Sequence, residues 1–199
     1  MGLVLNYLEG ETPLEEDEIR GLLIPGISNK KKLDEFEQKN IEEAVLFFRK
    51  KRNISLEEFL SENFIKKLHI KMFYGVWSWA GKFRKTEKSI GADPNIISIE
   101  VKKLLDDCFY WIANTVFSKE EIAIRLKHRL VKIHLFNNGN GRHSRLLADL
   151  MMEKVFKLPS FSWGHDDLYV DSSARKLYLK ALRRADLDYY DELLVFARS

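Results

Sequence analysis

A short segment of the chain combines residue types that bind phosphate with one that can move a proton. Residues 134–145 read HLFNNGNGRHSR. The asparagines and glycines at 137–141 tolerate positive φ and leave backbone amides unpaired. A helix that begins near Asn140 would add its free N-terminal amides and the positive end of its dipole. The segment therefore predicts an anion site that takes a phosphate.

Three side chains in this segment could act on a bound phosphate ester. Arg142 and Arg145 are three residues apart, so they share one face of the predicted helix and both guanidinium groups can reach a polyphosphate. His134 precedes the loop, where its imidazole can take a proton from a nucleophile that attacks phosphorus. Each feature alone is more often structural than functional. Their convergence within so few residues favours a nucleotide-phosphate site with His134 as general base.

Helices must position this segment, and the spacing of apolar residues predicts where they run. Two of them begin at capping boxes, Ser55 with Glu58 and Ser118 with Glu121, whose side chains satisfy free backbone donors. Pro159 ends the helix that follows the loop. The predicted helices cover about 33–52, 55–76, 101–113, 118–133, 140–158, 172–185 and 189–198.

The predicted architecture is a single, mainly α domain with one β-hairpin. Residues 1–32 show no sustained hydrophobic period, so they are expected to form an irregular arm laid over a domain of residues 33–199. Residues 82–84 and 95–98 are separated by turn residues and are expected to pair as a hairpin. A length of 199 residues allows one sizeable core, and no internal repeat suggests a second domain.

Composition excludes several classes of protein. The net charge is only +3, from 33 basic and 30 acidic residues that are mixed along the chain, which argues against nucleic-acid binding. No apolar stretch is long enough to span a bilayer, and the N-terminus does not resemble a secretory signal, so we expect a cytoplasmic protein. The single Cys108 excludes an internal disulfide and lies in an apolar helical pattern, as a core residue does.

Residues 134–145 resemble the motif HPFx[D/E]GN[G/K]RxxR of the Fic family, most of whose members transfer AMP from ATP to a hydroxyl of a target protein. Residues 77–94, WSWAGKFRKTEKSIGADP, resemble the approach and flap hairpin of Fic domains. The resemblance implies a Fic-type helical bundle with its core at about 64–158. Nearly the whole chain is similar to the subgroup called mobile mystery protein B, whose members are bacterial and carried near a helix-turn-helix protein.

The resemblance implies a role for each motif residue. His134 would deprotonate the target hydroxyl, and Phe136 would pack beneath the loop. Arg142 would neutralise the leaving pyrophosphate, and Arg145 would hold the terminal phosphate of ATP. Mg²⁺ would bridge the phosphate oxygens. The anion hole around the α-phosphate would consist of Gly139, Asn140 and Gly141.

Two positions depart from the family motif. Asn138 stands where the family has an acidic Mg²⁺ ligand, and a neutral amide oxygen binds a hard cation less strongly than a carboxylate does. Leu135 replaces proline, which frees φ and restores an amide donor. Asn138 is therefore expected to weaken metal binding, and Leu135 to change loop rigidity slightly.

The predicted flap is expected to hold the target protein. A target strand could add to the edge of the hairpin and present its hydroxyl in line, as in β-augmentation. An equally weighted alternative is that the exposed flap residues are plain hairpin surface. The flap residues assigned to target binding are Arg84, Lys85, Thr86, Ile96 and Ile97.

Regulation is not predicted to come from a standard inhibitory helix. Many Fic proteins carry the pattern [S/T]xxxE[G/N], whose glutamate blocks the second motif arginine. This chain has a Glu-Gly pair at 9–10 and a Glu-Asn pair at 62–63. Neither fits the pattern, because Leu5 and Glu58 stand where Ser or Thr is required. We therefore hypothesise that inhibition comes from a separate chain, such as the helix-turn-helix neighbour.

Three functions are left open. The first is AMP transfer to a Ser, Thr or Tyr hydroxyl of a target protein. The second is transfer of phosphate, or of another diphosphate-linked group, on the same fold. The third is a binding module with weak or lost catalysis, which Asn138 favours. A separate metal site at His165, Asp166 and Asp167 is a minor alternative, because no second His or Cys lies at ligand spacing.

Overall fold

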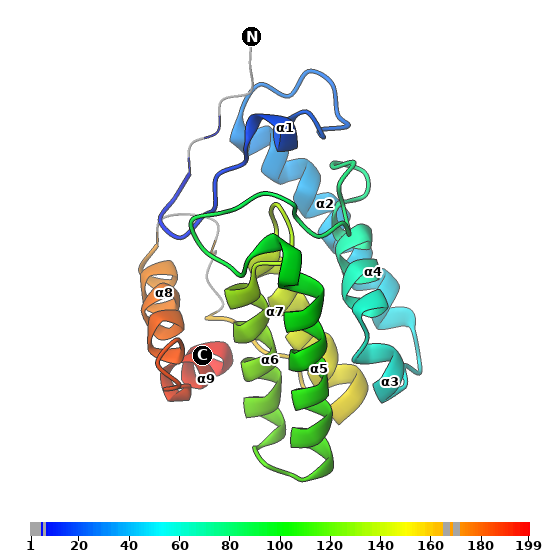
Figure 1. Cartoon of the computed structure of the whole chain (residues 1–199), viewed down its shortest axis with the longest axis vertical. Helices are drawn as coiled ribbons and strands as arrows, with labels where there is room; N and C mark the ends of the chain where they lie inside the picture. The colour runs from blue at the N-terminus through cyan, green and yellow to red at the C-terminus, as the bar shows by residue number, and fades with distance from the viewer. Residues whose placement is uncertain (1–4, 6, 165–167, 169–171) are drawn as a thin grey trace.

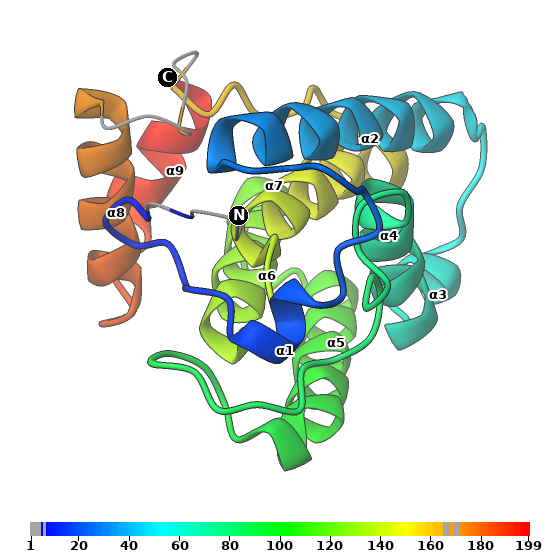
Figure 2. The same cartoon turned by 90° about the horizontal axis from the view of Figure 1, so that it is seen from above.

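The centre of the fold is a pair of helices, α6 (Lys119–Ile133) and α7 (Asn140–Leu150), which pack against each other. In this computed structural model, which describes residues 5, 7–164, 168 and 172–199, the neighbouring helices surround that pair (Figures 1 and 2). α5 (Ile97–Ala113) packs against α6 on one side, while α2 (Lys30–Lys50) and α4 (Glu62–Phe73) pack together on another. The segment that carries the motif thus joins the two central helices.

The remaining elements are short or lie at the edge of the bundle. α8 and α9 pack against each other and flank α6 (Figure 1). The π-helix continues directly from α7 and ends before Pro159. The bounds of these elements are α1 Glu16–Ile19, α3 Leu56–Phe59, a 3₁₀-helix at Pro94–Ile96, the π-helix Met151–Phe156, α8 Ser173–Ala185 and α9 Asp191–Arg198.

The serine half of each predicted capping box is present. The hydroxyl of Ser55 accepts a hydrogen bond from the amide of Glu58, and that of Ser118 accepts one from the amide of Glu121. The predicted helix 55–76 is nevertheless split after Phe59, because the hydroxyl of Ser61 caps a new helix, α4. In the described part of the chain, no helix combines the length and apolarity needed to cross a bilayer.

The prediction of a mainly helical protein is confirmed, but the predicted β-hairpin is wrong. Among the described residues there is no β-strand, only an isolated bridge between Leu22 and Trp77. Residues 82–92 are irregular coil with bends and without ladder pairing, and the expected second strand is helical: Pro94–Ile96 form the 3₁₀-helix and Ile97 begins α5. Asp93 caps this turn by accepting from the amide of Asn95, which favours helix over strand.

The segment before α2 crosses the end of the bundle where α6 stops and α7 starts (Figure 2). Its α1 lies beside residues 82–92, where the Glu18 carboxylate accepts hydrogen bonds from Thr86 at 2.8 Å and Lys88 at 2.6 Å. Backbone bonds from the amide of Leu23 to Val76 and from that of Ser78 to Gly21 fix it further. We call residues 7–15 the arm and residues 82–92 the flap.

Candidate active site

His134 lies at the end of α6 in a conformation that turns the chain away from the helix. Its φ of 55° is left-handed, and its amide still donates to the carbonyl of Leu130. The side chain is only 5% exposed, yet neither ring nitrogen has a hydrogen-bond partner among the described residues. Because His134 borders a pocket, its imidazole is available to a group that enters this pocket.

The surroundings of His134 keep the imidazole neutral. Burial, followed by the positive charges of Arg84 and Lys88, lowers its pKa from 6.5 to about 4, against a smaller opposite effect of Glu18. A general base must be unprotonated at the working pH. His134 therefore has the protonation state needed to accept a proton at neutral pH.

The loop between the two helices is closed by the side chain of Asn140. Its amide oxygen accepts from the amide of Phe136 at 2.9 Å, and its amide nitrogen donates to the carbonyl of Phe136 at 2.7 Å. Gly139 caps α7 with a φ of 78°, and a Cβ there would lie 2.5 Å from the ring of Phe73. Position 139 thus requires glycine, and α7 begins at the pocket that Gly139, Asn140 and Gly141 line.

A buried histidine that the motif does not include supports this loop from below. The ring of Phe136 is fully buried and stacks on that of His69, with centroids 3.7 Å apart. Nδ1 of His69 accepts from the amide of Gly81 at 2.9 Å, so Nε2 carries the proton and donates to the carbonyl of Asn138 at 3.1 Å. Burial holds the pKa of His69 well below its usual value, so this neutral bridge persists.

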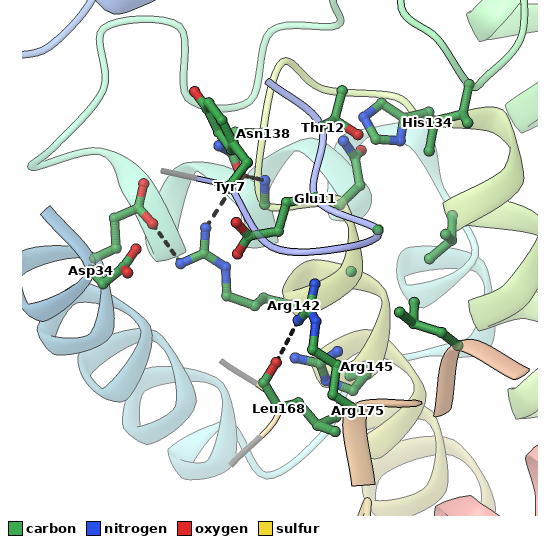
Figure 3. Close-up of a pocket in the computed structure, with 18 of the residues that line it drawn as sticks. Tyr7, Glu11, Thr12, Asp34, His134, Asn138, Arg142, Arg145, Leu168 and Arg175 are labelled. Atoms are coloured by element: carbon green, nitrogen blue, oxygen red, sulfur yellow. Dashed lines mark hydrogen bonds and ion pairs between the residues drawn. The ribbon is translucent and has the colours of Figure 1, made fainter. Parts of the chain in front are cut away.

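Both motif arginines line the same pocket as His134 (Figure 3). Nη1 of Arg142 lies 2.5 Å from the Glu37 carboxylate, and its guanidinium lies over the ring of Phe73. Arg145 lies one turn further along α7, with its guanidinium 5.6 Å from the centre of the Tyr178 ring. The pocket therefore has two planar cations next to the amides that begin α7, which suits an extended polyphosphate.

The predicted metal ligand does not form a metal site with its neighbours. The side-chain oxygen of Asn138 accepts from the amide of Gly139 at 2.5 Å and lies 3.4 Å from Nη2 of Arg142. Within the described ranges, no group of three His, Cys, Asp or Glu side chains could hold an ion. The residues present therefore do not fit Mg²⁺ on their own. The predicted cluster at 165–167 lies outside the described residues.

The five residues assigned to target binding do not share a hairpin, because the described residues contain no β-strand, and their role in target binding stays a prediction. Arg84 is buried, and its guanidinium donates to backbone carbonyls, including those of His134 at 2.6 Å and Thr86 at 2.8 Å. Lys85 is exposed, while the Thr86 hydroxyl is bound to α1. The other two residues, Ile96 and Ile97, lie in the helical segment, where Ile97 is part of the core.

Several residues that line the pocket carry no motif signal. The arm contributes Tyr7, Glu11 and Thr12, and Figure 3 shows them over the motif residues. From α8, Tyr178 lines the pocket and Arg175 donates to the carbonyl of Leu168 at 2.6 Å. The sequence does contain a signal for Glu37, because this residue falls in the apolar stripe of α2, where a buried carboxylate requires a partner. That stripe consists of Leu33, Glu37, Ile41, Ala44 and Phe48.

The geometry of the pocket defines a class of site. A helix N-terminus, two arginines and a neutral, unpaired histidine border one pocket, so a phosphate ester could bind and a proton could leave its attacking group. This combination is expected of a protein that transfers a phosphorus-centred group. Cys108 lies elsewhere in the core, where burial raises the pKa of its thiol to about 12 and makes it a poor nucleophile.

Comparison with known proteins shows which family part of this chain is similar to. Residues 59–152 match the model of the Fic/DOC family. A Fido domain-containing protein of Dictyostelium discoideum is 32% identical over 99 residues, which are 50% of this chain and 63% of that protein. The chain thus covers less than two thirds of this relative.

Solved structures share the fold at lower sequence identity. Fic-1 from C. elegans has a TM-score of 0.63 and 23% identity over 90% of this chain, which corresponds to 50% of the Fic-1 chain. BepC from Bartonella tribocorum, solved with bound AMPPNP, has a TM-score of 0.63 and 17% identity over 92% of this chain and 97% of its own. A Fic domain from Bartonella quintana, solved with bound ADP, has a TM-score of 0.63 and 18% identity over 87% of this chain and 86% of its own.

Proposed function

We propose that this protein transfers AMP from ATP to a Ser, Thr or Tyr hydroxyl of a target protein. The observation that carries the proposal is His134, whose buried, neutral imidazole has no described partner and borders the same pocket as Arg142 and Arg145. Members of the Fic family typically transfer AMP or similar groups to proteins. The bound nucleotides of BepC and of the Bartonella quintana domain support a nucleotide as substrate.

In the proposed reaction the target hydroxyl oxygen attacks the α-phosphorus of ATP. A new O–P bond forms, the bond from the α-phosphorus to the bridging oxygen breaks, and pyrophosphate leaves. The hydroxyl proton moves to a ring nitrogen of His134, while the amides at the start of α7 stabilise charge on the α-phosphate oxygens. Arg142 and Arg145 neutralise the charge that develops on the leaving pyrophosphate. Mg²⁺ bound to the phosphates would add charge neutralisation and stays a prediction.

Apolar side chains of the pocket favour a nucleotide over a simple phosphate. Val131 comes from α6, Ile90 from the flap, and Leu179 and Leu182 from α8. These groups offer a surface for a flat base beside the charged end of the pocket. The nearby arm lines the same pocket, so we expect it to shift when a nucleotide enters.

Control by a separate helix-turn-helix protein, by analogy with mobile mystery protein B, stays a prediction.

Labelled nucleotides distinguish this proposal from phosphotransfer. Incubation of the protein with a lysate and ATP labelled at the α-phosphate should label target proteins, whereas label at the γ-phosphate should not appear on them. The opposite pattern would establish phosphotransfer instead. Label from neither position, despite nucleotide binding, would favour the binding module that the neutral Asn138 suggests.

A further inference from the structure

The buried carboxylate of Glu37 is the only charged group in the apolar stripe of α2, which is fully described. Its side chain is 2% exposed. One carboxylate oxygen accepts from Nε1 of Trp77 at 2.5 Å, and the other lies 2.5 Å from Nη1 of Arg142. The bond to Trp77 fixes the carboxylate, so the second oxygen offers Arg142 an acceptor in one defined direction.

The guanidinium of Arg142 is held on several sides. Nη2 lies 3.4 Å from the side-chain oxygen of Asn138, and the central carbon lies 5.0 Å from the centre of the Phe73 ring. The side chain is 16% exposed. Figure 3 shows it inside the pocket, on the side where Asp34 of α2 lies. Glu37 carries a full negative charge at 2.5 Å, so it directs the cation more strongly than the neutral Asn138 and Phe73 do.

We propose that Glu37 is a positioning residue, which orients Arg142 toward the leaving phosphates. This inference rests on the proposed function and adds to the motif a residue from α2. An oriented cation stabilises charge that grows in the transition state without reorganising. Before the reaction begins, the same carboxylate offsets part of the positive charge that Arg142 presents to a bound nucleotide. Loss of Glu37 should therefore slow the chemical step without weakening nucleotide binding.

The main test compares Glu37→Gln with the wild type in two assays. We expect kcat for transfer from α-labelled ATP to fall by about 10-fold to 100-fold. We expect the dissociation constant of AMPPNP, measured by calorimetry, to stay equal or become smaller. Glu35→Gln is the matched control, because Glu35 is exposed on the same helix, and it should behave as the wild type. An unchanged or increased kcat for Glu37→Gln would overturn the proposal.

A double-mutant cycle tests whether Glu37 acts through Arg142. The variant Glu37→Gln/Arg142→Gln should have the same kcat as Arg142→Gln alone. A further loss in the double variant would show an independent, structural role and would overturn the proposal. Glu37→Asp retains the charge at a shorter reach, so it should recover part of the lost kcat. It also replaces Glu37→Gln in the cycle if thermal unfolding shows that the amide variant does not fold.

Failure of the proposed function can be separated from failure of this inference. If the wild type transfers nothing from α-labelled ATP, AMP transfer is refuted and AMPPNP binding alone decides about Glu37. In that case Arg142→Gln should bind AMPPNP more weakly than the wild type does. Glu37→Gln should bind it at least as tightly as the wild type, and the double variant should bind it as weakly as Arg142→Gln does. Weaker binding by Glu37→Gln than by the wild type would overturn the inference.

Discussion

The motif loop at 137–141 and the flap at 82–92 both adjoin His134, but different interactions hold them. The loop is closed by contacts within a few residues, since the side chain of Asn140 brackets Phe136, and His69 supports it from α4. The flap depends on contacts across the chain. Its Arg84 donates to the carbonyl of His134, fifty residues away, and its two ends donate backbone hydrogen bonds to the carbonyls of Ile133 and Leu135.

This difference has a physical consequence for the two sides of the site. A loop closed by local bonds is already organised when a ligand arrives, so it suits the constant part of the proposed substrate, its phosphates. The flap is instead held by contacts to distant segments, the carbonyls at 133–135 and the Glu18 carboxylate of α1, while some of its residues stay exposed. The backbone groups of its exposed residues, such as Lys85 and Glu87, are better placed to meet a variable partner.

Removing the glycine that the loop requires should have the largest effect. Gly139→Ala puts a Cβ at a φ of 78° and within 2.5 Å of the Phe73 ring. We expect a loss of about 100-fold in transfer and a destabilisation of about 1–3 kcal/mol. Gly141→Ala is the comparison, because its Cβ would meet only Arg145, at 3.8 Å. If the two variants were equally stable in chemical denaturation, the loop would not depend on Gly139.

Removing the cation that anchors the flap should affect target modification more than nucleotide binding. Arg84→Met leaves buried carbonyls of His134 and Ala92 without their donor, which we expect to cost about 3 kcal/mol and to lower target labelling about 10-fold. Affinity for AMPPNP should change less than labelling. Lys85→Met, at an exposed position, is the control. Equal losses of labelling and AMPPNP affinity would contradict the division between loop and flap.

The same contrast explains what the sequence could predict. The helices around the site follow from apolar spacing, and the loop from its run of Asn and Gly, because both depend on neighbouring residues. The flap was expected to be a hairpin, yet Asp93 caps a helical turn where the second strand was predicted. The acceptors of Arg84 and the partner of Glu37 come from distant segments, so only the fold brings them together.

A smaller effect is expected from restoring the acidic residue of the family motif. Asn138→Asp adds a carboxylate beside the phosphate site, and carboxylates bind Mg²⁺ better than amides do. We expect about a 3-fold higher rate of transfer with Mg²⁺, and no gain when the metal is chelated. A gain that persisted with chelator present would point to an effect on Arg142, which Asn138 also contacts, rather than on a metal.

The smallest change is expected from pH. The pKa of His134 is lowered from 6.5 to about 4, so the folded protein keeps the base neutral at and above neutral pH and protonates it only as the pH falls through about 4. Transfer should therefore vary less than about 2-fold between pH 6 and 8. As the pH falls, the unfolded chain protonates this histidine near pH 6.5, before the folded protein does. Its contribution to stability is therefore present above pH 6.5 and is lost as the pH falls toward 4. A rate that halves near pH 6.5 would contradict this.

The central claim is that His134 is the general base of a nucleotide-transfer site. The most direct measurement compares target labelling from α-labelled ATP by the wild type and by His134→Ala, with AMPPNP affinity and thermal unfolding as controls. We predict a loss of about 1,000-fold in labelling with AMPPNP affinity nearly unchanged, because the imidazole moves a proton and does not hold the phosphates. Undiminished labelling by a folded His134→Ala variant would contradict the claim.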